Sequence, residues 1–181
     1  MHRDYLENLL NNYQGVDSDE EQMRQRMLLF VKQNEDCFKR ELAIGHITGS
    51  AWIVNPARTK TLMLHHRKLN RWLQPGGHSD GNPDTLTVAL REASEESGID
   101  LKHIKPVYET IFDIDIHTIP SNKKEAQHEH FDVRFLLAID DQLPLISNEE
   151  SNQVKWLALD EVSAFNDDQS IKRMLKKTTG E

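Results

Sequence analysis

The chain has 181 residues, the length of about one domain, and 37% of them are hydrophobic. Its 22 Lys and Arg residues against 30 Asp and Glu residues give a formal net charge of −8, which disfavours nucleic-acid and anionic-membrane partners because both require basic surface. Cys37, the single cysteine, cannot form an internal disulfide. The sequence shows neither a secretory signal pattern nor an apolar run of the roughly 18 residues that a membrane span needs. We expect a soluble, cytoplasmic protein.

Two helices are predicted before the main domain. Apolar residues recur at helical spacing over Tyr5–Tyr13, and Asp17 or Ser18 can cap a second helix. The apolar stripe of this second helix consists of Met23, Met27, Phe30 and Val31. We expect residues 1–42 to form a helical extension that packs on a domain formed by residues 43–181. A homodimer contact and a lid over the substrate are the alternative roles.

After this extension, the spacing of the apolar residues predicts both strands and helices, as in a mixed α/β domain. Strands are predicted at His46–Val54, Thr61–His65, Val107–His117, Phe131–Ile139 and Val154–Leu157. Short helices are predicted at Asp160–Phe165 and Ser170–Lys177.

A longer helix is predicted between the second and third of these strands. It follows a break at Pro75–Gly77 and a polar loop. Asn82 is the expected N-cap, Pro83 the first helical residue and Asp84 an acid in the first turn. Gly98 is expected to end the helix.

Three acidic residues gather on one face of this helix. Glu92, Glu95 and Glu96 are spaced i, i+3 and i+4, so they are surface neighbours that repel one another by roughly 0.2–0.5 kcal/mol per pair. Arg91 reaches Glu95 at i+4 and can neutralise only part of this charge. A divalent cation would turn the repulsion into attraction, and carboxylates without His or Cys partners favour Mg²⁺ or Mn²⁺ over Zn²⁺. A solvated acidic face is the alternative.

The segment Gly77–Ile99 resembles the signature of the Nudix hydrolases. The residues in register with that signature are Gly77, Arg91, Glu92, Ala93, Glu95, Glu96, Gly98 and Ile99. The departure is Pro83, which stands at the first glutamate of the pattern; the family does not usually use that residue as a principal metal ligand. The likeness extends over residues 43–165 and implies a Nudix-type α/β/α sandwich with a mixed sheet.

The resemblance implies a metal-dependent pyrophosphohydrolase. Such an enzyme cleaves a nucleoside diphosphate linked to another group by attack of water at phosphorus, assisted by Mg²⁺ or Mn²⁺. By carry-over from the family, Arg91 orients a glutamate, for which Glu95 is the candidate, and Glu92 and Glu95 belong to the catalytic set. The metal ligands implied by the resemblance are Gly76, Glu92, Glu95 and Glu96.

The sequence leaves the catalytic base and the substrate contacts open. Glu150 and its neighbour Glu149 are candidates for the base, as is the segment Glu125–Glu129; an exposed acidic loop is the alternative. His78 follows the Gly-Gly turn and could reach a phosphate or donate a proton. The candidate phosphate-binding residues are Arg67, Lys68 and Arg71.

Histidines are unusually numerous in the expected domain. Besides His78 they include His65, His66, His117, His128 and His130. His128 and His130 alternate at the start of a predicted strand, so they are expected to point to the same side. A satisfied surface or core histidine is the alternative for each.

Two other functions compete with hydrolysis. A Nudix-like module could sense a nucleotide such as ADP-ribose without cleaving it, although such modules tend to lose the glutamates that are intact here. An enzyme like isopentenyl-diphosphate isomerase needs a cysteine and a set of metal-binding histidines; it is less favoured because Cys37 precedes the domain.

Overall fold

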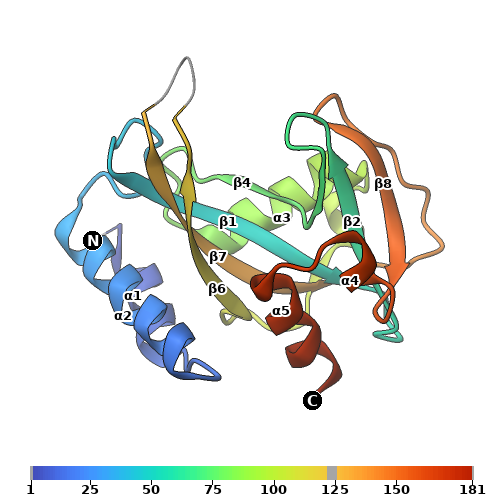
Figure 1. The fold of residues 1–181 in the computed structure, drawn as a ribbon, viewed down its shortest axis with the longest axis horizontal. Helices are drawn as coiled ribbons and strands as arrows, with labels where there is room; N and C mark the ends of the chain where they lie inside the picture. Colours follow the sequence, from blue (N-terminus) through green and yellow to red (C-terminus); the bar gives the residue numbers. More distant parts are fainter. Residues whose placement is uncertain (1, 122–125, 181) are drawn as a thin grey trace.

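The computed structural model describes residues 2–121 and 126–180. Within them, eight strands form one mixed sheet (Figure 1). The strands are β1 (Gly45–Val54), β2 (Lys60–His66), β3 (Arg71–Leu73), β4 (Gly76–His78), β5 (Lys105–Pro106), β6 (Asp113–Ile119), β7 (His128–Ala138) and β8 (Ser151–Ala158). The helices are α1 (Asp4–Asn12), α2 (Ser18–Gln33), α3 (Thr85–Ser97), η1 (Leu101–His103, a 3₁₀ turn), α4 (Val162–Phe165) and α5 (Gln169–Thr179).

Strand β1 organises the sheet. It pairs in parallel with β7 along its whole length, from Gly45 opposite Glu129 to Val54 opposite Ala138. It also pairs antiparallel with β2 and with the short β4. All of its residues are buried, which fits a central strand covered on both faces.

The two faces of the sheet carry separate parts of the core, because side chains alternate along β1. Ile47, Ala51 and Ile53 join the core cluster that includes the inner face of α3. Trp52 and Val54 join a second cluster that includes residues of α4 and α5. Figure 1 shows α3 behind β1 and α5 in front of it, which confirms the predicted α/β/α arrangement.

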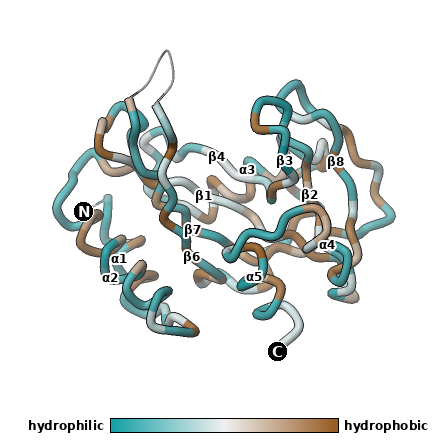
Figure 2. Tube along the Cα trace, viewed as in Figure 1, coloured by the Kyte–Doolittle hydropathy of each residue, from teal (hydrophilic) through white to brown (hydrophobic). Residues whose placement is uncertain are grey.

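The helical pair predicted at the N-terminus is confirmed. The side chain of Asp17 caps α2 by accepting a hydrogen bond from the Glu20 amide. The ring of Phe30 stacks on Phe131 of β7, with centroids 3.9 Å apart. Along α1, α2 and α5 hydrophobic and hydrophilic residues alternate, as expected for helices that have one face on a core (Figure 2).

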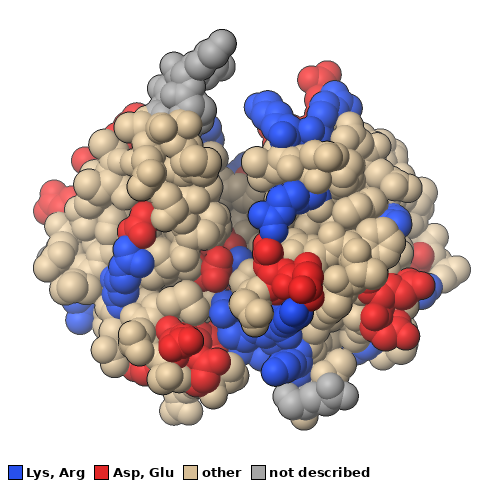
Figure 3. All heavy atoms as spheres, in the orientation of Figure 1, with Lys and Arg blue, Asp and Glu red and all other residues tan. Residues whose placement is uncertain are grey.

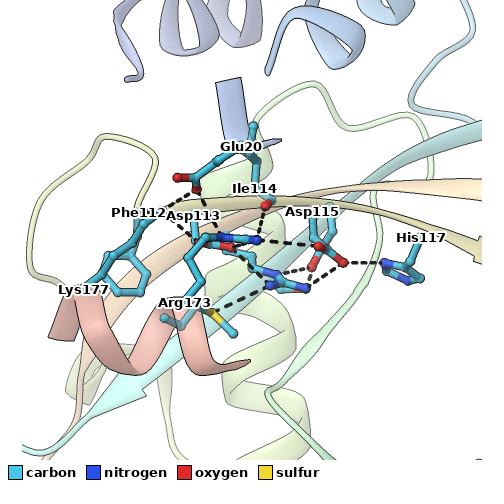
Figure 4. Close-up of polar contacts among 12 residues, drawn as sticks. Glu20, Phe112, Asp113, Ile114, Asp115, His117, Arg173 and Lys177 are labelled. Carbon is cyan, nitrogen blue, oxygen red and sulfur yellow. Dashed lines mark hydrogen bonds and ion pairs between the residues drawn. The ribbon is translucent and has the colours of Figure 1, made fainter. Parts of the chain in front are cut away.

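A buried ion cluster joins the two ends of the chain to the sheet (Figure 4). Asp113 of β6 accepts hydrogen bonds from Lys177 of α5 (2.9 Å) and from Arg173 (2.8 Å). Lys177 also donates to Glu20 of α2, which is fully buried. Arg134 of β7 completes the cluster, 3.1 Å from Asp113.

Three expectations need correction. Only the second part of the strand predicted over Val107–His117 forms: residues 107–112 lie in the connection between β5 and β6, and β6 begins at Asp113. Residues 76–78 form β4 rather than a loop, since β1 supplies a partner strand. The helix begins at Thr85, so Pro83 lies outside it: the side chain of Asp84, not Asn82, accepts from the Thr87 amide and is the N-cap.

No helix among the described residues has the length and the apolar character needed to cross a membrane.

Candidate active site

Helix α3 lies directly on β1, and this contact positions its acidic face. A Cβ atom on Gly49 of β1 would lie 2.8 Å from the carbonyl oxygen of Thr85 and 2.9 Å from the Cβ of Val88. Only glycine therefore allows the helix to approach so closely. At the other end Gly98 adopts the left-handed conformation (φ 72°) that ends the helix, as predicted.

Two of the three glutamates turn inward against β4. Glu96 is 4% exposed, and its Oε2 accepts a hydrogen bond from the Gly76 amide at 2.9 Å. The carboxylate of Glu92 fills the space beside Gly77, where a Cβ would lie 2.4 Å from Glu92 Oε1. The side chain of Glu95, in contrast, is 56% exposed. The acidic face is therefore a buried pair with a third carboxylate at its edge.

Burial makes the inner pair reluctant to ionise. It raises the pKa of Glu96 to about 8, against the opposing effect of the hydrogen bond from Gly76, and the charges of Glu92 and Glu150 add to the rise. Burial also raises the pKa of Glu92, although Arg91 acts in the opposite direction. Carboxylates with raised pKa values that crowd one another are typical of functional sites.

Arg91 links the glutamates to β4. Its Nη2 lies 2.8 Å from Glu92 Oε1 and donates to the carbonyl oxygen of His78 at 3.0 Å. Its Nη1 lies 3.4 Å from Glu95 Oε2. Arg91 thus contacts Glu92 of the buried pair and Glu95 at its edge, and its shorter contact is with Glu92.

Glu150 approaches the cluster from the turn before β8. Its charge raises the pKa values of both Glu92 and Glu96, so it lies within electrostatic range of them. Its carbonyl oxygen accepts from the amide of Arg67 at 2.8 Å, which places the end of β2 beside this turn. Glu125, the first residue of the other candidate segment, lies outside the described residues.

The basic residues proposed to hold phosphates divide into two groups. Arg67 and Lys68 lie at the start of the β2–β3 turn, where the Arg67 side chain donates to Asn152 at 3.2 Å. Arg71 forms an ion pair with Asp168, at the N-cap of α5. Figure 3 shows Lys and Arg side chains over this turn, beside a hollow that separates it from the β6–β7 side.

His78 does not stand alone. Its ring contacts those of His46 on β1 and His130 on β7, and His46 in turn contacts His128. His128 and His130 share one side of β7, as predicted, with ring centroids 5.3 Å apart. Burial and the surrounding histidines lower the pKa of His130 to about 2. His46 was missed by sequence reasoning, because only the parallel pairing of β1 with β7 sets it beside His130.

Comparison with known proteins identifies the family. The family model described as the NUDIX domain matches residues 46–178, and the chain belongs to that family. A probable DHNTP pyrophosphohydrolase of Lactococcus lactis subsp. cremoris (strain MG1363) is 32% identical over 85 residues, which cover 46% of this chain and 49% of that protein. The chain thus matches about half the length of this curated relative.

Two solved structures illustrate the shared fold. An Ap4A hydrolase of C. elegans superposes with a TM-score of 0.60 at 19% identity, over 74% of this chain and 95% of that one. The E. coli dihydroneopterin triphosphate pyrophosphohydrolase gives a TM-score of 0.57 at 18% identity, over 72% and 92% of the two chains. At these identities the likeness concerns the fold.

Proposed function

We propose that the protein is a pyrophosphohydrolase that depends on Mg²⁺ or Mn²⁺ and cleaves the diphosphate of a nucleoside diphosphate linked to another group. Membership of the Nudix family supports the reaction class. The observation that carries the proposal is the inward pair Glu92 and Glu96, packed against the glycines of β4. A structural helix face gains nothing from burying two adjacent carboxyl groups.

The donor set fits a hard cation. Carboxylate oxygens are the ligands that Mg²⁺ and Mn²⁺ prefer. Burial, and after it the charges of Glu92 and Glu150, raise the pKa of Glu96, and a bound cation would favour its ionised form. Glu92, Glu95 and Glu96 would hold the metal, with the backbone of Gly76 beside them. When bound, the cation neutralises phosphate oxygens and lowers the pKa of a coordinated water.

The other residues have supporting roles in this proposal. Arg91 keeps Glu92 and Glu95 in place through its two contacts. Glu150, near the carboxylates but on a separate turn, takes the proton from the attacking water. Arg67 and Lys68 bind substrate phosphates as they enter past the β2–β3 turn, and His78 donates a proton or a hydrogen bond to a phosphate.

The alternative functions are weaker. Burial raises the pKa of the Cys37 thiol to about 12, so the cysteine that an isomerase of the isopentenyl-diphosphate type needs would be unreactive. A nucleotide sensor that binds without cleavage has no need of a complete glutamate cluster.

A substrate panel tests the proposal. Purified protein is incubated with ADP-ribose, dinucleoside polyphosphates, sugar nucleotides, nucleoside triphosphates and dihydroneopterin triphosphate, with Mg²⁺ or Mn²⁺, in ¹⁸O-labelled water. Dihydroneopterin triphosphate is included because of the curated relative. We expect metal-dependent cleavage with ¹⁸O in a phosphate product, and none with a Glu96→Gln preparation. Binding without turnover across the panel would favour the sensor.

We also propose the organisation that goes with this function. Residues 1–42 form a helical extension and residues 43–181 the hydrolase domain, which acts on a small nucleotide substrate in the cytoplasm. Any homodimer would be visible as a doubled mass in light scattering.

A further inference from the structure

Three histidines from three different strands converge on one point. His46 of β1 is the register partner of His130 on β7, and their ring centroids are 4.7 Å apart. His78 of β4 lies opposite Thr48, and its ring is 4.9 Å from His46 and 5.1 Å from His130. His46 lies on β1, and His78 and His130 lie on strands that pair with β1. The sheet, and not a loop, therefore fixes the convergence.

The distances between the ring nitrogens suit a shared metal ion. One nitrogen from each of His46, His78 and His130 can be chosen so that the three lie within 4.8 Å of one another. Tetrahedral zinc sites have Zn–N bonds of about 2.0–2.1 Å, which puts ligand nitrogens about 3.3 Å apart. Small rotations of the side chains would close the difference.

The burial of a ring nitrogen of His130 calls for a partner. His46 is 2% exposed. Nε2 of His130 is buried and has no hydrogen-bond partner within residues 2–121 and 126–180. A buried polar atom without a partner costs roughly 1–3 kcal/mol, and a metal ion would use its lone pair.

Two further histidines flank the cluster. Nδ1 of His128 lies 2.9 Å from the carbonyl oxygen of Ala126, which orients a fourth ring beside His46. His117, whose ring is 5.5 Å from His130, hydrogen-bonds Asp115 at 3.2 Å (Figure 4).

The histidine group is separate from the carboxylates of α3. Side chains alternate along β4, so Gly77 faces Glu92 while His78 points to the opposite face of the sheet. The two groups also differ in chemistry: carboxylates favour Mg²⁺ and Mn²⁺, whereas imidazoles favour Zn²⁺, Co²⁺, Ni²⁺ and Cu²⁺.

We propose that His46, His78 and His130 form a second metal site, which takes a divalent transition ion of the zinc class. Three protein ligands leave a coordination position for water or for an oxygen of another molecule. This site uses none of the glutamates, so it does not rest on the proposed hydrolase activity; His78 is the one residue to which both proposals give a role.

Cobalt binding tests this site without reference to turnover. The Glu96→Gln protein, which lacks one carboxylate of α3, is stripped with a chelator and titrated with Co²⁺. We expect one equivalent to give the intense visible absorption of a tetrahedral nitrogen site, and Zn²⁺ to displace it while Mg²⁺ does not. Adding His78→Gln or His130→Gln should weaken binding by more than about a hundredfold, since even losing an outer partner costs 10–100-fold. Adding His103→Gln, on η1 outside the cluster, is the matched control.

The unmodified protein supplies a second test that does not depend on whether a variant folds. Long-range ¹H–¹⁵N spectra of the histidine rings should show three imidazoles shifting together at one equivalent of Zn²⁺. Either of two results would overturn the site: His130→Gln binding Co²⁺ as tightly as its parent, or Zn²⁺ leaving the ring signals of the unmodified protein unchanged.

Discussion

The Gly76 amide donates a hydrogen bond to Glu96 Oε2 at 2.9 Å, and this contact joins β4 to the acidic face of α3. A backbone donor on a short strand therefore orients a buried carboxylate. The next residue, Gly77, gives the carboxylate of Glu92 its space. The two glycines explain why both glutamates face the strand while Glu95 faces solvent.

The charge of Glu96 is the first feature to test. Glutamine has nearly the same shape and can accept the same hydrogen bond from Gly76, so Glu96→Gln should keep its thermal unfolding temperature. Because an amide is a poor ligand for a hard cation, we expect kcat to fall on the order of 10³-fold, as when a key electrostatic contact is lost. Steady-state kinetics and thermal melts measure both. A near-normal kcat would remove Glu96 from the ligand set.

The two glycines of β4 should respond differently to alanine. A Cβ on Gly77 meets the far end of the Glu92 side chain, which can swing away, so Gly77→Ala should fold while its activity falls. Displacing a catalytic group by about 1 Å can cost roughly 10²-fold in rate.

Gly76→Ala is the matched comparison. Its Cβ would lie 2.1 Å from Oγ of Ser50 and 3.1 Å from the Ser50 Cα, so the pairing of β1 with β4 must shift. We expect a loss of about 1–3 kcal/mol in the free energy of unfolding, measured in urea. Equal stability losses in Gly76→Ala and Gly77→Ala would contradict the inference that only the Cβ at residue 76 displaces a strand.

The role of Glu150 can be separated from that of its neighbour. If Glu150 is the base, Glu150→Gln should lower kcat by about 10²–10⁴-fold and remove the acidic limb of the pH–rate profile. Both variants, Glu150→Gln and Glu149→Gln, should keep the unfolding temperature, because both residues are exposed. A larger loss in Glu149→Gln would transfer the role to that residue.

The buried ion cluster should make the protein sensitive to acid. Burial alone would raise the pKa of Asp115, but its hydrogen bond with His117 and the charge of Arg134 bring it to about 2. The pKa of Asp113 is lowered too, as Arg173, Arg134 and Lys177 outweigh its burial. A carboxyl group whose pKa is lowered by folding contributes its full stabilisation at pH values above its ordinary pKa of 3.8. This contribution is lost as the pH falls through the pKa of the group in the folded state.

Urea unfolding between pH 7 and pH 2 measures this effect. The free energy of unfolding should drop below about pH 4, and Asp113→Asn should cost roughly 3–5 kcal/mol at pH 7 by leaving buried cations uncompensated. Asp36→Asn, which removes an exposed partner of Lys39, is the control and should have little effect. A similar loss of unfolding free energy in both variants would show that the buried contacts of Asp113 contribute no more to stability than an exposed ion pair.

Local pattern predicted most elements but few of the contacts between them. The spacing of Glu92, Glu95 and Glu96 placed them on one helix face, and the structure adds that Glu92 and Glu96 turn inward, which depends on β4. Strand β4 itself was missed because three residues with two glycines carry no periodic signal. The pairing of β1 with β7, which sets His46 beside His130, depends on residues far apart in the sequence.

The contact between Glu20 and Lys177 spans 157 positions of the chain. A shortened protein that keeps only the family-matched residues 46–178 would retain Lys177 and Arg173 but lose a fully buried acid that both contact. It would also uncover the Phe131 ring. Anyone seeking a minimal active fragment should therefore keep the first two helices, since trimming them strips a counter-charge from the opposite terminus.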